Sequence, residues 1–146
     1  MSDLSQEQAD FFLSIDKSRV DETTWLLPGP GDKINIPLIS FEYKEEFLLD
    51  ISRSRIVLQK ATYQTRAKQI HPIARIDLGG QPHRNPDDSE IGSPHLHVFR
   101  EGFGLRWAFA LDPKLFLTPN ELVPTLYDFM AYCNIVDAPD FQVSLF

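Results

Sequence analysis

The chain has 146 residues, a formal net charge of −7 and a hydrophobic content of 42%, which predicts one folded domain over residues 1–146 and argues against a disordered chain. The first residues are polar and acidic, and no apolar run approaches the roughly 20 residues that cross a bilayer, so we expect a cytoplasmic protein without a secretory signal or a membrane partner. Cys133 is the only cysteine, which excludes an intramolecular disulfide and fits a reducing compartment.

The charge is unevenly distributed along the chain. From Arg53 to Arg106 there are nine basic and five acidic side chains, a net charge of +4, whereas the remainder of the chain carries −11. A positive region attracts phosphate groups. The alternative is that these charges lie on solvated strand faces that bind nothing.

The N-terminal half predicts one helix followed by strands. Ser5 and Gln8 have the spacing of a capping box, so a helix is expected to begin after Ser5 and to fade near Lys17. Residues 28–31 (Pro-Gly-Pro-Gly) are a strong turn signal. Alternating or β-branched segments then predict four strands. These are Lys33–Ser40, the alternation of Phe47, Leu49 and Ile51 after Glu42, Arg55–Thr65, and Ile70–Leu78.

A long loop and a hairpin are expected next. Residues 81–94 are rich in Pro, Asp, Asn, Ser and Gly, which favour turns. A loop of this length is unusual in a compact domain and often functional. The following segments, His95–Arg100 and Leu105–Leu111, are predicted to pair as a hairpin around a turn that contains two glycines.

A second helix is expected near the C-terminus. Thr118 is placed to cap it, Pro119 to occupy its first position and Glu121 to complete a capping box, with Cys133 in the apolar stripe of the helix. The tail from Val136 to Phe146 is expected to add a short edge strand or to pack over the core. Its alternating apolar residues are Phe141, Val143 and Leu145.

This segregation of helices and strands predicts an α+β fold. Because consecutive strands joined by short turns pair antiparallel, we expect a single antiparallel meander sheet of about five or six strands. The N-terminal and C-terminal helices should pack on one face of this sheet. The other face should be open and partly polar.

Three of the four histidines lie close together in the sequence and carry the main functional signal. His95 and His97 are two residues apart on a predicted strand, so they share one face. Arg75 and Asp77 share the polar face of the preceding strand. If the two strands are neighbours joined by the loop that carries His83, these side chains converge. The predicted set is Arg75, Asp77, His83, Asn85, His95, His97 and Glu101.

Acid–base catalysis on a phosphodiester is the first chemistry that suits this set. Histidine titrates near neutral pH, so His83, His95 and His97 can act as general base and acid on RNA without a cofactor. Arg75 would stabilise charge on the phosphoryl oxygens. The supporting residues in this interpretation are Asp77, Asn85 and Glu101.

Metal binding is the second chemistry, and a purely structural role is the third alternative. His83, His95, His97 and Asp77 have side chains that bind transition metals, with zinc the first choice. In the structural alternative, His95 and His97 are exposed side chains that form cross-strand hydrogen bonds and nothing more.

A pattern over roughly residues 70–110 resembles a signature of an uncharacterised family of small bacterial and prophage proteins. Its motifs are Arg75-x-Asp77, Pro82-His83-x-Asn85, Pro94-His95-x-His97 and Glu101-Gly102. The pattern is also distantly similar to that of TumE-type toxins of toxin–antitoxin modules, which carry two histidines in the proline turn where this chain has one. The resemblance implies a bacterial cytoplasmic ribonuclease-like toxin that a cognate antitoxin neutralises.

The expected function is therefore a metal-independent endoribonuclease toxin, with RNA and an antitoxin as partners. The alternatives are a non-enzymatic, phage- or bacteria-encoded inhibitor that binds a protein through its acidic flanks, and a histidine-site metal-binding protein. A nuclease should lose activity but keep its stability when His95 and His97 become alanine, whereas an inhibitor should tolerate the change. The sequence predicts neither the RNA target nor the oligomeric state.

Overall fold

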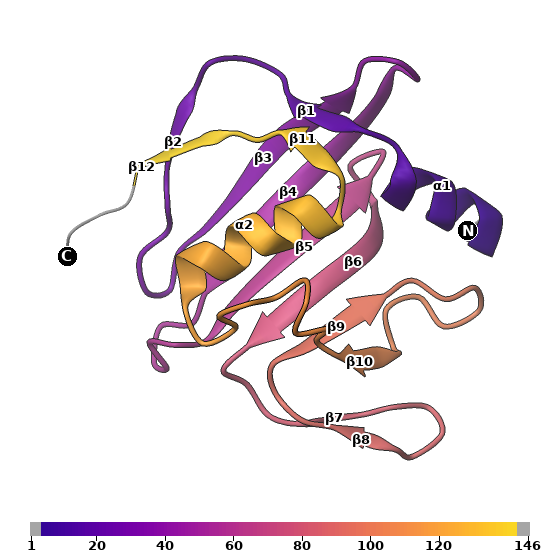
Figure 1. The fold of residues 1–146 in the computed structure, drawn as a ribbon, viewed down its shortest axis with the longest axis vertical. Helices are drawn as coiled ribbons and strands as arrows, with labels where there is room; N and C mark the ends of the chain where they lie inside the picture. The colour runs from indigo at the N-terminus through magenta and orange to yellow at the C-terminus, as the bar shows by residue number, and fades with distance from the viewer. Residues whose placement is uncertain (1–3, 143–146) are drawn as a thin grey trace.

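The computed structural model describes residues 4–142 (Figure 1). Within these residues there are two helices, α1 (Gln6–Ser14) and α2 (Leu122–Tyr132), and neither is long and apolar enough to cross a membrane. The strands, in chain order, are β1 (Lys17–Arg19), β2 (Thr24–Leu26), β3 (Lys33–Ser40), β4 (Glu45–Arg53), β5 (Ala61–Ala67), β6 (His71–Leu78), β7 (His83–Arg84), β8 (Glu90–Ile91), β9 (His95–Val98), β10 (Ala108–Ala110), β11 (Ile135–Asp137) and β12 (Asp140–Gln142).

The main sheet has eight strands in the order β10-β9-β6-β5-β4-β3-β1-β11. Its central strands pair antiparallel as predicted, but β1 and β11 are parallel, so the sheet is mixed. The expected single antiparallel meander of five or six strands is therefore wrong. The two strands that the prediction lacked, β1 and β11, lie at one edge of the sheet. Each has only three residues, which is too few to show an alternation of apolar and polar side chains. Two small sheets pair β12 with β2 and β7 with β8.

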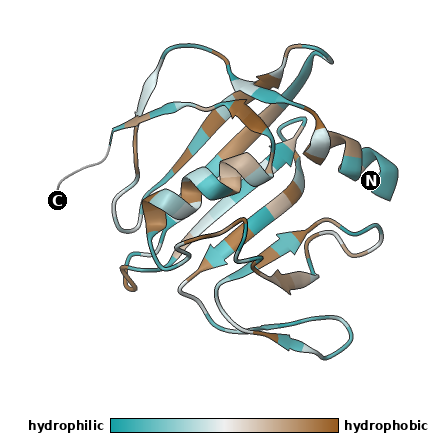
Figure 2. Ribbon diagram, in the orientation of Figure 1, coloured by the Kyte–Doolittle hydropathy of each residue, from teal (hydrophilic) through white to brown (hydrophobic). Residues whose placement is uncertain are grey.

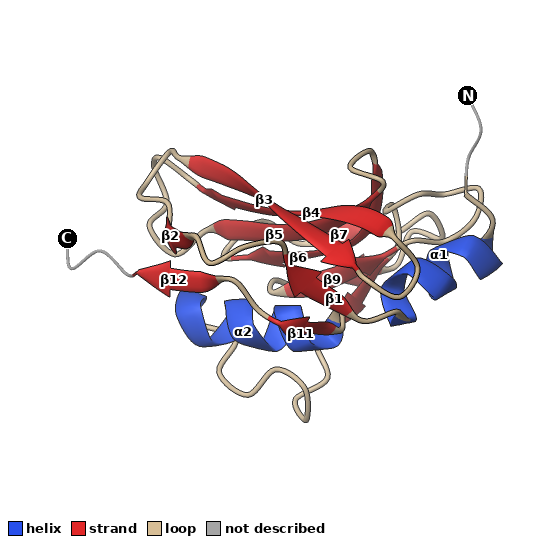
Figure 3. Ribbon diagram, turned by 90° about the horizontal axis from the view of Figure 1, so that it is seen from above, coloured by secondary structure: helices blue, strands red, loops and turns tan. Residues whose placement is uncertain are grey.

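Both helices lie on one side of the main sheet, and among residues 4–142 no helix covers the opposite side (Figure 3). Strand residues alternate between these two sides. In β4, Phe47, Leu49 and Ile51 face the helices and are at most 2% exposed, whereas Asp50 and Ser52 line a hollow on the other face. The same alternation of hydrophobic and hydrophilic residues is visible along the central strands in Figure 2. The core therefore lies between the sheet and α2, and the polar face is left for a site.

Helix α1 confirms the predicted capping box. The Ser5 hydroxyl accepts a hydrogen bond from the Gln8 amide, and the Gln8 side chain accepts one from the Ser5 amide. The helix ends at Ser14 rather than near Lys17, because Lys17 already belongs to β1. The buried Lys17 ammonium donates to three carbonyl oxygens near the C-terminal ends of both helices. These belong to Leu13, Ile15 and Cys133.

The predicted strand Arg55–Thr65 begins too early. Residues 55–60 form a turn, and the strand β5 starts at Ala61. The reason is local, because the Ser54 hydroxyl accepts hydrogen bonds from the amides of Ile56 and Val57 and thereby ends β4.

Helix α2 begins at Leu122, not at Pro119, and Glu121 makes no capping hydrogen bond with its side chain. Pro124 explains the late start. In a helix from Pro119 it would lie in the interior, where proline removes a hydrogen bond and clashes with the preceding turn, whereas the observed start places it in the first turn. Cys133 follows the helix and is fully buried, as predicted.

The tail contributes two short strands. Phe141 lies in β12, which pairs with β2, so part of the tail does form an edge strand. Val143 and Leu145, which continue the predicted alternation, lie outside the described residues.

Candidate metal centre

Strands β6 and β9 bring four of the predicted site residues together. The strands pair antiparallel, with Asp77 opposite His95 and Arg75 opposite His97. These side chains lie on the polar face of the sheet, because the intervening Ile76 belongs to the core on the other side. The convergence expected from the alternation is therefore observed for this pair of strands.

The loop 81–94 adds His83 through the hairpin β7–β8. The His83 ring centroid lies 4.7 Å from that of His97 and 5.8 Å from that of His95, and the latter two centroids are 4.9 Å apart. Asn85 fastens the hairpin to β10, because its side chain accepts from the Ala108 amide at 2.8 Å and donates to the Ala108 carbonyl at 3.0 Å. The three imidazoles thus form one cluster, and Asn85 positions the hairpin rather than contacting the rings.

The two histidines on β9 are covered. His95 is 3% exposed and His97 is 1% exposed. This burial contradicts the alternative in which they are exposed side chains on an open strand face. Arg75 and Asp77 have side-chain exposures of 32% and 24%, so the cluster reaches solvent through them.

Each of the three rings uses one nitrogen to bind a backbone carbonyl oxygen. His97 Nδ1 lies 2.7 Å from the Leu105 oxygen, and His95 Nδ1 lies 3.2 Å from the Gly92 oxygen. A carbonyl oxygen only accepts, so these ring nitrogens carry the proton. The same argument places a proton on His83 Nε2, which lies 2.7 Å from the carbonyl oxygen of residue 106. In a neutral imidazole, the other nitrogen of each ring then carries a lone pair and no proton.

Two of these lone-pair nitrogens meet one carboxylate oxygen. The Nε2 atoms of His97 and His95 lie 3.0 Å and 3.3 Å from Asp77 Oδ2. A lone pair facing a carboxylate is repulsive, so the arrangement requires added positive charge, supplied either by protons on the rings or by a metal ion between them.

Asp77 is ionised in this environment. Burial alone would raise its pKa, but in the metal-free chain the hydrogen bond that a protonated His97 Nε2 donates and the charge of Arg75 lower the pKa to about 2. Arg75 Nε lies 3.1 Å from Asp77 Oδ1, and the Thr62 hydroxyl lies 3.2 Å from the same oxygen. Burial lowers the pKa of His95. The Gly92 carbonyl and Asp77 raise the pKa again, but only in part. Its ring therefore favours the neutral form that ligates metals.

Asp77, His95 and His97 could hold a metal ion. Their ligand atoms all lie within 4.8 Å of one another. Tetrahedral zinc ligands at about 2.0–2.2 Å from the ion are separated from each other by about 3.3–3.6 Å, slightly more than the nitrogen–oxygen distances of 3.0 Å and 3.3 Å in this site. His83 Nδ1 is not part of this triad, although its ring packs against His97.

Glu101 does not join the site, which corrects the prediction. Its carboxylate accepts a hydrogen bond from the Gln6 amide at 2.7 Å, at the start of α1. The alternation that suggested its orientation ends at Val98, where β9 ends. Conversely, the sequence interpretation missed Thr62 and the carbonyl groups that orient the rings. Thr62 was detectable once β5 was paired with β6, whereas a backbone carbonyl leaves no signal in the sequence.

Comparisons with known proteins place the chain in a family but assign no activity. No curated protein and no solved structure matches it. The family match bears out the expectation of an uncharacterised family, and it includes no link to TumE-type toxins. The chain belongs to a family of unknown function, DUF6978, whose model matches residues 4–135.

Proposed function

We propose that this protein is a metal-dependent hydrolase whose ion, zinc in the first instance, is held by His95 Nε2, His97 Nε2 and the Asp77 carboxylate. The observation that carries the proposal is the position of the second nitrogen of each ring. Both rings are oriented by backbone carbonyl groups so that their free nitrogens meet an ionised carboxylate at 3.0 Å and 3.3 Å.

Three protein ligands suit a catalytic site better than a structural one. Structural zinc sites are closed by four protein ligands, whereas catalytic sites keep one position for water or substrate. A bound ion of this kind lowers the pKa of its water to about 7 and so supplies a nucleophile near neutral pH. Arg75 lies beside Asp77 and is 32% exposed. It is therefore placed to bind an anionic group that reaches the centre.

Metal content tests this proposal. The chain is freed of metal with a chelator, dialysed and titrated with zinc by calorimetry, and the bound metal is counted by elemental analysis. We expect one zinc ion per chain in the wild type and none above background in His95→Ala and His97→Ala.

His71→Ala is the matched control, because His71 begins β6 and is outside the triad. It should bind zinc as the wild type does. A wild-type chain that binds no stoichiometric zinc, cobalt or manganese contradicts the proposal, and so does equal loss in the His71 variant.

A metal-independent ribonuclease, as the similarity to TumE-type toxins implies, is the second candidate. The grouping of three imidazoles with Arg75 favours it. Acid–base catalysis, however, requires two rings that reach opposite sides of one phosphorus atom, and here the two Nε2 atoms converge on one carboxylate oxygen. RNA cleavage that survives chelator and is lost in the His95→Ala/His97→Ala variant would favour this candidate, and toxicity relieved by a co-expressed partner would add the antitoxin.

A further inference from the structure

Two rows of polar side chains cross the open face of the main sheet and end at the histidines. Cross-strand pairing places each member directly beside the next. The first row consists of Lys33, Ser52, Thr62, Asp77 and His95. The second runs parallel to it, from Asn35 to His97. Neighbouring strands lie about 4.8 Å apart, so each row spans about 19 Å. We name these two rows the polar track.

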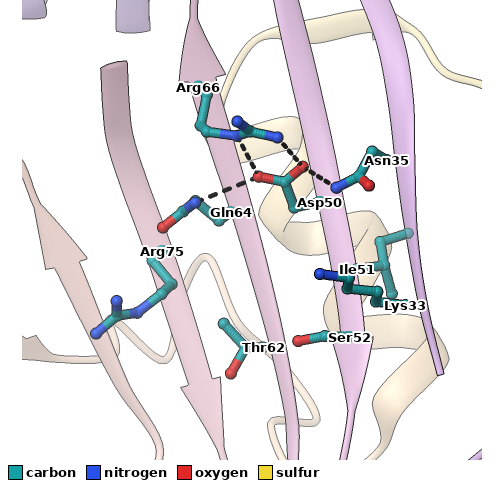
Figure 4. Close-up of a pocket in the computed structure, with 9 residues that line it drawn as sticks. All are labelled: Lys33, Asn35, Asp50, Ile51, Ser52, Thr62, Gln64, Arg66 and Arg75. Carbon is teal, nitrogen blue, oxygen red and sulfur yellow. Dashed lines mark hydrogen bonds and ion pairs between the residues drawn. The ribbon is translucent and has the colours of Figure 1, made fainter. Parts of the chain in front are cut away.

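The polar track is hollowed over β3, β4 and β5, and Arg75 on β6 borders the hollow on the side of the metal centre. Figure 4 shows the hollow, which has a volume of about 370 Å³ and includes Lys33, Ser52, Thr62 and Arg75 in its lining. This volume lies within the range of small-ligand sites. Thr62 and Arg75 both contact Asp77, so a ligand in the hollow would be adjacent to the proposed ion.

The charges in the hollow favour an anion. Asp50 is neutralised, because Arg66 binds both of its oxygens, at 2.6 Å and 2.9 Å. Arg75 is paired with Asp77 in the same way, so Lys33 leaves the hollow with a net positive charge. Among residues 4–142, no hydrogen bond or ion pair engages the Lys33 ammonium or the Ser52 hydroxyl. These groups are available to an anionic or hydroxyl group of a ligand.

The composition of the lining favours a small ligand over a nucleic-acid strand. Proteins that bind single-stranded nucleic acid stack successive bases on aromatic side chains. The nine residues that line the hollow include no aromatic residue. A second hollow of about 340 Å³ shares Gln64 and Arg75 with the first and is lined mainly by apolar groups, among them Leu4 and Phe99. A single apolar group attached to a phosphate would fit there.

We propose that the polar track binds a small phosphate ester and presents it to the metal centre, with Arg75 as the phosphate contact and with Lys33 and Ser52 as contacts of a second anionic or hydroxyl group of the ester. This inference rests on the proposed hydrolase function and adds the substrate class. The phosphate would lie between Arg75 and the ion, and Lys33 would hold a second anionic or hydroxyl group at the far end of the hollow.

Calorimetry on the zinc-loaded and the metal-free chain tests the inference, with AMP, ribose 5-phosphate and adenosine as probes. We expect both phosphates to bind and adenosine, which lacks the phosphate, to show no binding at the same concentrations. Lys33→Glu should weaken phosphate binding at least tenfold while the zinc content stays at one ion per chain. Lys114→Glu, outside the polar track, is the matched control and should bind as the wild type does.

The outcomes separate the two proposals. Lys33-dependent binding of AMP by a chain that takes up no zinc supports the polar track and contradicts the metal centre. Zinc uptake without binding of either phosphate overturns the polar track alone. Equal affinities of the Lys33→Glu and Lys114→Glu variants also overturn it, as does binding of an RNA oligonucleotide when neither small phosphate binds.

Discussion

Two carboxylates on the same face of the sheet, Asp50 and Asp77, show how similar settings lead to different chemistry. Each lies beside an arginine, Arg66 in one case and Arg75 in the other. Asp50 is surrounded only by groups that donate hydrogen bonds (Figure 4). These are Asn35, Gln64 and Arg66. Asp77 instead faces two ring nitrogens whose partner nitrogens already donate elsewhere.

The difference separates a structural network from a binding site. The donors around Asp50 satisfy its charge, so nothing further is needed to complete it. The surroundings of Asp77 are incomplete until protons or a cation enter. A half-buried carboxylate left in that condition is a candidate functional site.

The largest expected effect is on zinc affinity, which should fall when Asp77 is replaced but not when Asp50 is replaced. Asp77→Asn removes the only anionic ligand of the triad and should weaken zinc binding at least 100-fold, which corresponds to about 2.7 kcal/mol. Asp50→Asn should leave the affinity unchanged. Calorimetric titration of both variants measures this, and similar affinities in the two would contradict the distinction.

Removal of the metal should lower thermal stability. At a zinc concentration about 100 times the Kd, binding stabilises the folded chain by about 2.7 kcal/mol, which corresponds to a Tm shift of roughly 5–10 °C. Differential scanning calorimetry with and without chelator measures the shift. It should persist in Asp50→Asn and vanish in Asp77→Asn, and an equal shift in both variants would refute the assignment.

Acid should destabilise the metal-free wild type more than its Asp77→Asn variant. The pKa of Asp77 is about 2 in the folded chain and about 3.9 when unfolded, so its contribution is present above pH 4 and is lost as the pH falls from about 4 to 2. The loss amounts to about 2 kcal/mol. The lowered pKa of His95 acts in the same direction at higher pH. Urea unfolding at several pH values measures both, and parallel acid profiles for the two proteins would show that Asp77 contributes nothing.

The smallest effect concerns the structural network. Asp50→Asn converts charge-assisted hydrogen bonds with Arg66 into neutral ones and should cost about 1.5 kcal/mol of unfolding free energy. Urea denaturation at pH 7 measures the change. A variant as stable as the wild type would mean that the network around Asp50 is not structural.

The sequence predicted the parts of this molecule that follow from local patterns, namely the alternation of side chains along a strand and the capping of a helix. The alternation in β6 and β9 placed Asp77, His95 and His97 on one face, and the Ser5 capping box located α1. The orientation of the histidine rings was not predictable. It depends on the backbone carbonyl groups of residues 92, 105 and 106, and every residue type carries such a group. The pairing of the three-residue strands β1 and β11 was not predictable either, because such short strands show no alternation in the sequence. The prediction of an all-antiparallel sheet was wrong for this reason.

Anomalous diffraction at the zinc edge, from crystals of the zinc-loaded chain, tests the central claim most directly. We expect one strong peak per chain, about 2.0–2.2 Å from His95 Nε2, His97 Nε2 and an oxygen of Asp77. A peak elsewhere, or an empty triad in crystals grown with excess zinc, would contradict it.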